Sequence, residues 1–156
     1  MAEETDGAMY NSAYALGLAH PAFGVVASAT DLARFALHFA PNGPRIHSEG
    51  SVRAMTTIQT GLVKGQHVSL TGTSQENIVP WGIGFALQTE YVPALFSELA
   101  SFRTFGHGGA SGCQLMVDPQ DDVVVAVLTN THARNGREPW YQRLQSMINC
   151  ALANVK

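Results

Sequence analysis

The sequence predicts an α+β fold, in which an antiparallel sheet carries a C-terminal helix packed on it. Three observations lead to this class. Residues 28–39 have the apolar period of an amphipathic helix, and residues 105–128 contain strand-like runs separated by a short acidic turn. Residues 138–155 carry an apolar stripe at helical spacing, which predicts a helix made to lie on a sheet.

The amino-terminal part is expected to start irregularly and then to enter a helix. Residues 1–27 show no sustained period and predict irregular backbone. The positions at i, i+3, i+4 and i+7 of the following segment are Leu32, Phe35, Ala36 and Phe39. Ser28 or Thr30 can cap the free N–H groups of this helix, Asp31 suits its positive end, and residues 41–43 stop it.

The middle of the chain predicts less regular structure. Residues 48–58 fit a short helix with Val52 and Met55 facing inward. The polar residues 60–75 predict either a long loop or a weak hairpin. Residues 81–91 alternate enough to form a strand, whose two glycines weaken it and indicate a close approach of another backbone.

The carboxyl-terminal third predicts a hairpin. Strand-like runs at residues 105–119 and 121–130 are joined by a Pro-containing acidic turn at residues 118–122. Residues 123–128 are apolar at every position, as expected of a strand covered on both faces. The first run instead alternates two sets of side chains, which are Cys113, Leu115 and Val117 against Gln114 and Met116.

The last helix is predicted by its start and its stripe. Pro139 falls in the first turn, where its missing N–H costs no hydrogen bond. The apolar stripe consists of Trp140, Leu144, Met147, Ile148, Ala151 and Val155.

Composition limits the classes of function. A chain of 156 residues with 46% hydrophobic residues suits a single domain, residues 1–156. The net charge of -3 and the scattered basic residues predict no nucleic-acid partner. No apolar run approaches the length of a membrane span, and no signal peptide is evident. The chain as written is therefore expected to be soluble and cytoplasmic, without a membrane partner.

Cysteine and histidine spacing predicts neither a metal site nor a cofactor. Cys113 and Cys150 lie in apolar patterns and are expected to be buried free thiols rather than a disulfide. The six histidines include no i, i+4 pair with an adjacent Glu and no Cys/His cluster.

The strongest candidate for chemistry is a histidine followed by two glycines. The glycines beside His107 would let a ligand approach the backbone, although they also suit a tight bulge. An α/β-hydrolase would need a Gly-x-Ser-x-Gly elbow between a strand and a helix. Residues 109–113 end in cysteine instead of glycine and lie on the expected strand, so that interpretation fails.

The order of several segments resembles that in a known family. The segments are GVVASATDLARFALHF, SEGSVRAMTTIQTG, WGIGF and FGHGGASGCQLMVDPQDDVVVAVLTN, followed by the closing helix. This order resembles the C-terminal half of the serine β-lactamase-like family, which includes class C β-lactamases, penicillin-binding proteins and related esterases. The resemblance covers the chain from about residue 24 and is strongest over residues 107–130. It implies a partial β-lactamase/transpeptidase-like fold.

The resemblance implies roles for five neighbouring residues. His107, Gly108 and Gly109 match the family's Lys-Thr-Gly or His-x-Gly triplet, on the strand that borders the active site. Ala110 falls where the family places a backbone N–H that holds the oxyanion, so His107 and Ala110 are the expected catalytic residues. Gly108, Gly109 and Ser111 are expected to line the substrate-binding site. The alternative for Ser111 is a strand serine without a functional role.

The family's nucleophile motif is missing from these 156 residues. The family uses the Ser of a Ser-x-x-Lys. The only lysines are Lys64 and Lys156, and Gly61 and Ala153 stand three residues before them. A Tyr-x-Asn or Ser-x-Asn loop is also missing. Residues 10–12, Tyr-Asn-Ser, contain these residue types, but in the wrong order. We therefore expect little or no turnover by the chain alone.

Two functions follow from this pattern. The first is a fragment of a β-lactamase-like serine hydrolase, with ester, amide or β-lactam substrates. The second is a non-catalytic module that binds a small acyl or peptide-like ligand or serves in assembly. A new dyad of Ser111 with His107 is disfavoured, because residues i and i+4 of a straight strand lie far apart.

The last strand is the expected place of assembly. In the family, N-terminal strands pair beside it, and family members are often periplasmic or secreted. We expect residues 123–130 to be covered by a second copy in a homodimer, by a complementary N-terminal fragment, or by the chain's own first residues.

Overall fold

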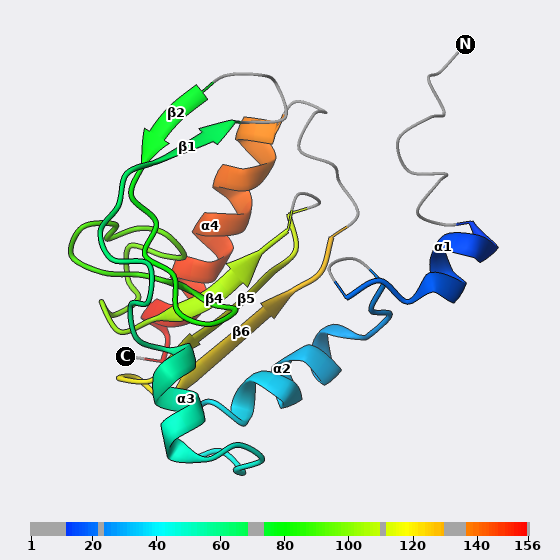
Figure 1. Cartoon of the computed structure of the whole chain (residues 1–156). Helices are drawn as coiled ribbons and strands as arrows, with labels where there is room; N and C mark the ends of the chain where they lie inside the picture. The colour runs from blue at the N-terminus through cyan, green and yellow to red at the C-terminus, as the bar shows by residue number, and fades with distance from the viewer. Residues whose placement is uncertain (1–11, 22–23, 69–73, 110–111, 130–136, 156) are drawn as a thin grey trace.

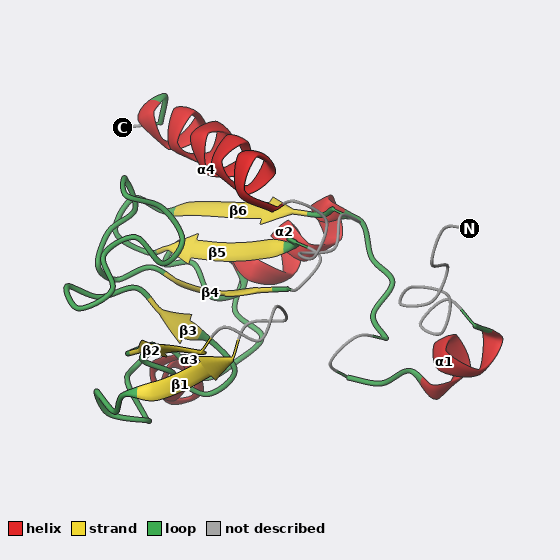
Figure 2. Ribbon diagram, turned by 90° about the horizontal axis from the view of Figure 1, so that it is seen from above, coloured by secondary structure: helices red, strands yellow, loops and turns green. Residues whose placement is uncertain are grey.

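The structure is a computed structural model, and it is organised around one antiparallel sheet. It describes residues 12–21, 24–68, 74–109, 112–129 and 137–155. The helices are α1 (Ala13–Leu18), α2 (Ala29–Leu37), α3 (Glu49–Met55) and α4 (Arg137–Ala153). The strands are β1 (Gly65–Val68), β2 (Ser74–Asn77), β3 (Ala86–Leu87), β4 (Phe105–Gly108), β5 (Gln114–Asp118) and β6 (Val123–Val127). The antiparallel sheet of order β3-β4-β5-β6, together with the helices, confirms the predicted α+β class (Figures 1 and 2).

The amino-terminal region contains a helix that the sequence did not predict. The N–H of Ala15 donates to Oγ of Ser12, which caps α1. The helix is six residues long and buries none of them, and it stands apart from the sheet (Figures 1 and 2). A helix this short, with no apolar stripe against the core, leaves no periodic signal in the sequence.

Helix α2 begins as its sequence predicts. Oγ of Ser28 accepts from the N–H of Asp31 at 3.1 Å, and the Asp31 carboxylate accepts from the N–H of Ser28 at 3.2 Å. This reciprocal arrangement is a capping box. The helix ends at Leu37, before the Pro-Asn-Gly segment at residues 41–43.

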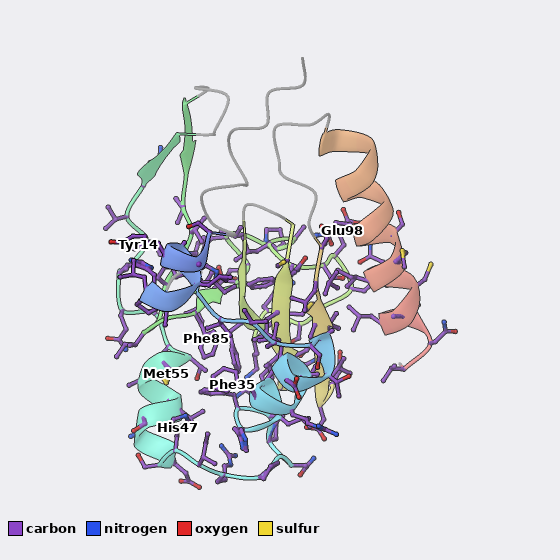
Figure 3. The ribbon with its side chains drawn as sticks, turned by 90° about the vertical axis from the view of Figure 1, so that its right-hand side faces the viewer. Tyr14, Phe35, His47, Met55, Phe85 and Glu98 are labelled. Atoms are coloured by element: carbon purple, nitrogen blue, oxygen red, sulfur yellow. The ribbon has the colours of Figure 1, made fainter. Side chains whose placement is uncertain are left out.

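Helices α2 and α3 contribute to an apolar cluster on one face of the sheet. Its buried members are Ala36, Phe39, Ala40, Phe85, Leu87, Phe105 and Val117. The Phe39 and Phe85 rings meet edge to face with centroids 5.0 Å apart. Val52 and Met55 of α3 pack against the same cluster, which confirms their predicted inward direction (Figure 3).

Helix α4 contributes to a second apolar cluster, formed with the side chains on the opposite face. Ile148 and Leu152 are buried against Met116 of β5, and Val125 of β6 joins the same cluster. Valine side chains of β6 contribute to both clusters, which confirms that this strand is covered on two faces.

The predicted apolar stripe of α4 was partly wrong. Met147 is 70% exposed and Val155 is 63% exposed, and Ala151 is exposed too, whereas Leu152 is buried. A stripe of large apolar residues can be drawn on more than one side of this helix, and contact with the sheet selects the side that carries Ile148 and Leu152. The side chains of Trp140 and Leu144 lie outside the described part.

The run predicted as one strand over residues 105–119 is in fact two strands. The chain turns between β4 and β5, where the N–H of Gly109 donates to the Cys113 carbonyl at 2.8 Å. Gly112 adopts a φ of 82° there, which glycine reaches without strain. The apolar alternation of residues 113–117 follows the turn directly, so the sequence pattern gave no sign that the chain reverses before it. The second hairpin, through residues 118–122, is confirmed by the pairing of Asp118 with Val123.

The segment 81–91 is also mostly not a strand. The N–H of Gly82 donates to the Phe85 carbonyl at 2.8 Å, and this turn folds Trp81 back to pair with Ala86. The predicted close approach is confirmed at Gly82, where a Cβ would lie 1.9 Å from the Met55 carbonyl oxygen. It was wrong for Gly84, where a Cβ would meet no described atom within 4 Å. Contact with the end of α3 therefore decided the path of this segment.

Two further expectations are resolved by the fold. Of the alternatives for residues 60–75, the hairpin is observed, formed by β1 and β2. The expectation of two buried thiols was wrong, because Cys113 is half-buried and Cys150 is exposed. Cys150 lies on the side of α4 that faces away from the second cluster.

Candidate functional site

The candidate site is the carboxyl-terminal end of β4, where the side chain of His107 is exposed. Gly106, one residue earlier, pairs with Met116, and a Cβ there would lie 2.0 Å from the Leu115 carbonyl oxygen. Only glycine therefore allows β4 and β5 to approach this closely. The pairing continues through His107 with Leu115, and the His107 side chain is exposed.

The imidazole of His107 has two neighbours that fix its orientation. Nδ1 lies 2.8 Å from the Gly108 carbonyl oxygen. Because a carbonyl can only accept, Nδ1 carries a proton in this contact, and Nε2 of the neutral ring presents its lone pair. The Trp81 ring meets the imidazole edge to face, with centroids 5.3 Å apart. The two contacts hold the imidazole beside an exposed strand end.

Gly108 differs from Gly106 in what surrounds it. Among the described residues, the nearest atom to a Cβ at position 108 is the Cys113 carbonyl oxygen, at 4.0 Å. Neither packing nor a left-handed backbone therefore requires a glycine here. Its effect is to leave space over the backbone beside His107. The exposed Gly109 then begins the turn to β5.

The other two residues predicted for the site, Ala110 and Ser111, lie outside the described residues. The structure brings His107, Gly108 and Gly109 together at one strand end and assigns no position to the remaining two. It does remove one argument made from the sequence. The chain reverses between β4 and β5, so the spacing of a straight strand no longer counts against a pair of His107 with Ser111.

Among the described residues, no group of three or more His, Cys, Asp or Glu side chains could hold a metal ion. No helix in this part of the chain is long and apolar enough to cross a membrane.

Sequence analysis missed the contact of Trp81 with His107. The two residues are far apart in the sequence, and the turn through Gly82 to Phe85 brings the indole back to the sheet. The tryptophan between a proline and a glycine in PWGIGF was the one available signal, because aromatic residues beside a tight turn often cover a neighbouring element.

A buried polar network at the other end of β4 was missed too. The Asp118 carboxylate is fully buried and accepts from the N–H of Ser101 at 2.7 Å and from its hydroxyl at 2.6 Å. Burial is the largest influence on this carboxyl and opposes its ionisation. Hydrogen bonds from Ser101, Gln120 and Asp121 together outweigh burial and lower the pKa of Asp118 below its ordinary value of 3.8.

The same network holds the loop before β4. Gln88 is buried, and its Nε2 donates to the carbonyls of Ser97 at 2.9 Å and Ala100 at 3.1 Å. Its Oε1 accepts from the N–H of Phe96 at 2.9 Å. A glutamine directly after a short strand gives no sequence signal of this role, because its partners are backbone groups of another segment.

An antiparallel sheet with helices on both faces is the architecture of β-lactamase-like and penicillin-binding-protein-like chains, and this chain has that fold. Comparison with known families leads to the same class. The sequence model of the family named Beta-lactamase matches residues 2–146, and the chain belongs to this family.

Two solved structures are similar to the chain. A β-lactamase from Mycobacterium bovis is 31% identical with a TM-score of 0.67, over 85% of this chain and 46% of that one. A penicillin-binding protein homologue from Caulobacter crescentus is 23% identical with a TM-score of 0.52, over 78% of this chain and 30% of that one. The chain thus spans less than half the length of either structure. Among curated proteins no match was found.

Proposed function

We propose that the chain supplies the histidine-bearing wall of a serine-hydrolase site of the β-lactamase type. In this proposal, residues 1–156 form one domain, the C-terminal portion of the family fold, and the nucleophile comes from polypeptide outside these residues. The observation that carries the proposal is the exposed imidazole of His107, oriented by Gly108 and Trp81 beside an unobstructed strand end.

The chemistry proposed for this wall is binding of an acyl group. Nε2 of His107 accepts a hydrogen bond from the substrate or from the incoming nucleophile, and the neutral ring leaves that nitrogen free to do so. An extended ester, amide or peptide-like ligand would lie over Gly108, where a Cβ would meet no described atom closer than 4.0 Å. The backbone N–H of Ala110 would then hold the oxyanion, with Gly109 and Ser111 lining the ligand.

The proposed partner binds along β6. This strand is last in the order of the four-stranded sheet, and within the described part no further strand pairs with it. Val25 and Val26, before α2, are 74% and 86% exposed. A complementary N-terminal fragment or a second copy would pair with β6 and would cover exposed apolar side chains such as Val25 and Val26.

The first experiment tests for a nucleophile within the chain. The purified protein is incubated with a fluorophosphonate and, separately, with a chromogenic β-lactam, and its intact mass is then measured. We expect an unmodified mass and no hydrolysis. A stoichiometric adduct that disappears on mutation of a single serine would overturn the assignment of the nucleophile to another polypeptide.

A second measurement tests the wall itself. An N-acyl dipeptide is titrated into the protein while the imidazole protons of His107 are followed by NMR. We expect them to shift with saturation, and we expect His107→Ala to abolish binding while the free energy of unfolding changes by less than about 0.5 kcal/mol. Equal binding by His107→Ala would contradict the proposal.

A non-catalytic assembly module is the second candidate. It is favoured by the open edge of β6 and by α1, which buries none of its residues. Sedimentation separates the two cases when it is combined with activity. A complex that forms through β6 and is never modified by the serine probe supports the assembly module. A strict monomer at high concentration argues against a second copy as partner.

A further inference from the structure

A hollow lies near the end of β4 that is remote from His107. Its volume is about 810 Å³, and it is bordered by α3, the end of β3 and the loop that leads into β4. Its apolar lining consists of Phe39, Val52, Ile58, Leu87, Phe102 and Phe105. Thr104 borders this hollow three residues before His107, which corresponds to roughly 10 Å along the strand.

Three arginines border this hollow. Arg45, Arg53 and Arg103 all line it, whereas Glu49 is the one acidic residue that does so. Among the described residues the ion pair observed joins Arg34 to Asp31 on α2, at 3.8 Å, and involves none of these three guanidinium groups. An excess of positive charge therefore gathers here, in a chain whose net charge is -3.

The backbone that presents Arg103 is held firmly. Oγ of Ser101 accepts from the N–H of Arg103 at 3.2 Å, and the same hydroxyl donates to the buried Asp118. Gln88 fixes the preceding residues of this loop through their carbonyls. Arg53 is carried by α3, whose first turn is capped by Ser48. The two arginines therefore extend into the lining from two hydrogen-bonded backbone segments, the loop before β4 and α3.

A buried hydroxyl at the same place lacks a partner. Thr104 is fully buried and lines the hollow, and its Oγ1 makes no hydrogen bond within the described part of the chain. An unsatisfied buried hydroxyl costs about 1–3 kcal/mol, so groups of this kind are usually paired. The lining shields this hydroxyl, so a ligand oxygen would accept from it only where the lining side chains move aside.

We propose that this hollow binds a small amphipathic anion, a carboxylate or phosphate monoester carried on an alkyl or aromatic group. The arginines hold the anionic head through charge-assisted hydrogen bonds, for which the planar guanidinium suits both head groups. The apolar portion lies against the phenylalanine, valine and leucine side chains of the lining. This binding is independent of the acyl-transfer site at His107.

The test compares matched probes by isothermal titration. Octanoate and octyl phosphate carry the two anionic heads on one alkyl chain, whereas octanol lacks charge and octylamine reverses it. We expect one or both anions to bind, more weakly at high salt, and neither control to do so. A preference between the two anions identifies the head group. Absence of saturable anion binding up to millimolar concentration, or equal binding of octanol, would overturn the proposal.

Variants locate the site. Arg53→Ala and Arg103→Ala should each weaken anion binding about 5- to 10-fold, since each removes one charge-assisted contact. Arg34→Ala is the matched control, because Arg34 is an exposed arginine on α2 that does not line the hollow, and it should change binding less than 2-fold. His107→Ala should leave anion binding unchanged, which separates this result from failure of the acyl site. An equal loss in Arg34→Ala would show non-specific charge attraction and contradict the proposal.

Discussion

The two ends of β4 differ in almost every physical property. At its start, Thr104 and Phe105 are buried, and the loop before them is held by the Asp118 and Gln88 networks. At its end, His107 and the glycines that follow are exposed. One short strand is therefore anchored by burial and hydrogen bonds at its start and is exposed at its last residues. The comparison indicates that the anchored end positions the open one.

Two glycines in the same strand show this contrast most directly. Gly106 is required by packing, because a Cβ would meet the Leu115 carbonyl oxygen at 2.0 Å. Gly108 has no such neighbour within the described part of the chain. Two glycines that are two positions apart thus have different roles: Gly106 lies in the tightly packed part of the strand, and Gly108 lies in its exposed part.

The largest expected effect separates these two glycines. Gly106→Ala should destabilise the protein by more than about 4 kcal/mol, because backbone of the adjacent strand must move to admit a methyl group. Gly108→Ala should change the free energy of unfolding by less than about 1 kcal/mol and weaken acyl-ligand binding. Urea unfolding followed by circular dichroism checks both values. Equal destabilisation by the two substitutions would contradict the difference between the two ends.

The next effect concerns the anchor at the start of the strand. Asp118→Ala should cost about 3 kcal/mol, since it leaves the N–H and hydroxyl of Ser101 and the N–H of Gln120 without their acceptor. Glu90→Ala, at an exposed position, is the control and should change stability by less than about 0.5 kcal/mol. The same urea titration measures both. A loss no larger than that of the control would show that the network does not anchor β4.

The smallest effect is the pH dependence of this anchor. The pKa of Asp118 is lower in the folded protein than its ordinary value of 3.8, so ionised Asp118 stabilises the fold above that pH. This stabilisation is lost as the pH falls through the folded pKa, where the carboxyl gains a proton. The stability difference between the protein and Asp118→Asn should therefore shrink from pH 6 to pH 3. A difference that stays constant over this range would contradict the ionised network.

The sequence predicted the elements whose signals are local. Helix α2 has both a periodic face and a capping box, and the Asp118 to Asp122 turn has acidic and proline residues between apolar runs. The site triplet at His107 was found for a similar reason, because three adjacent residues carry it. Failures occurred where a distant segment decides, as at Trp81, which tight packing against α3 turns back toward His107.

By itself, the sequence determined the α+β class, the capped helix α2, the hairpin through Asp118 and the resemblance that comparison with known families confirmed. These depend on periodicity, capping and turn chemistry, which act over a few residues. Only the tertiary structure decided which side of α4 is buried, where the chain reverses after Gly109, and how arginines from α3 and from the loop before β4 meet at one hollow. The reason is physical, since burial and charge clustering depend on neighbours in space, and the chain brings these together only when it folds.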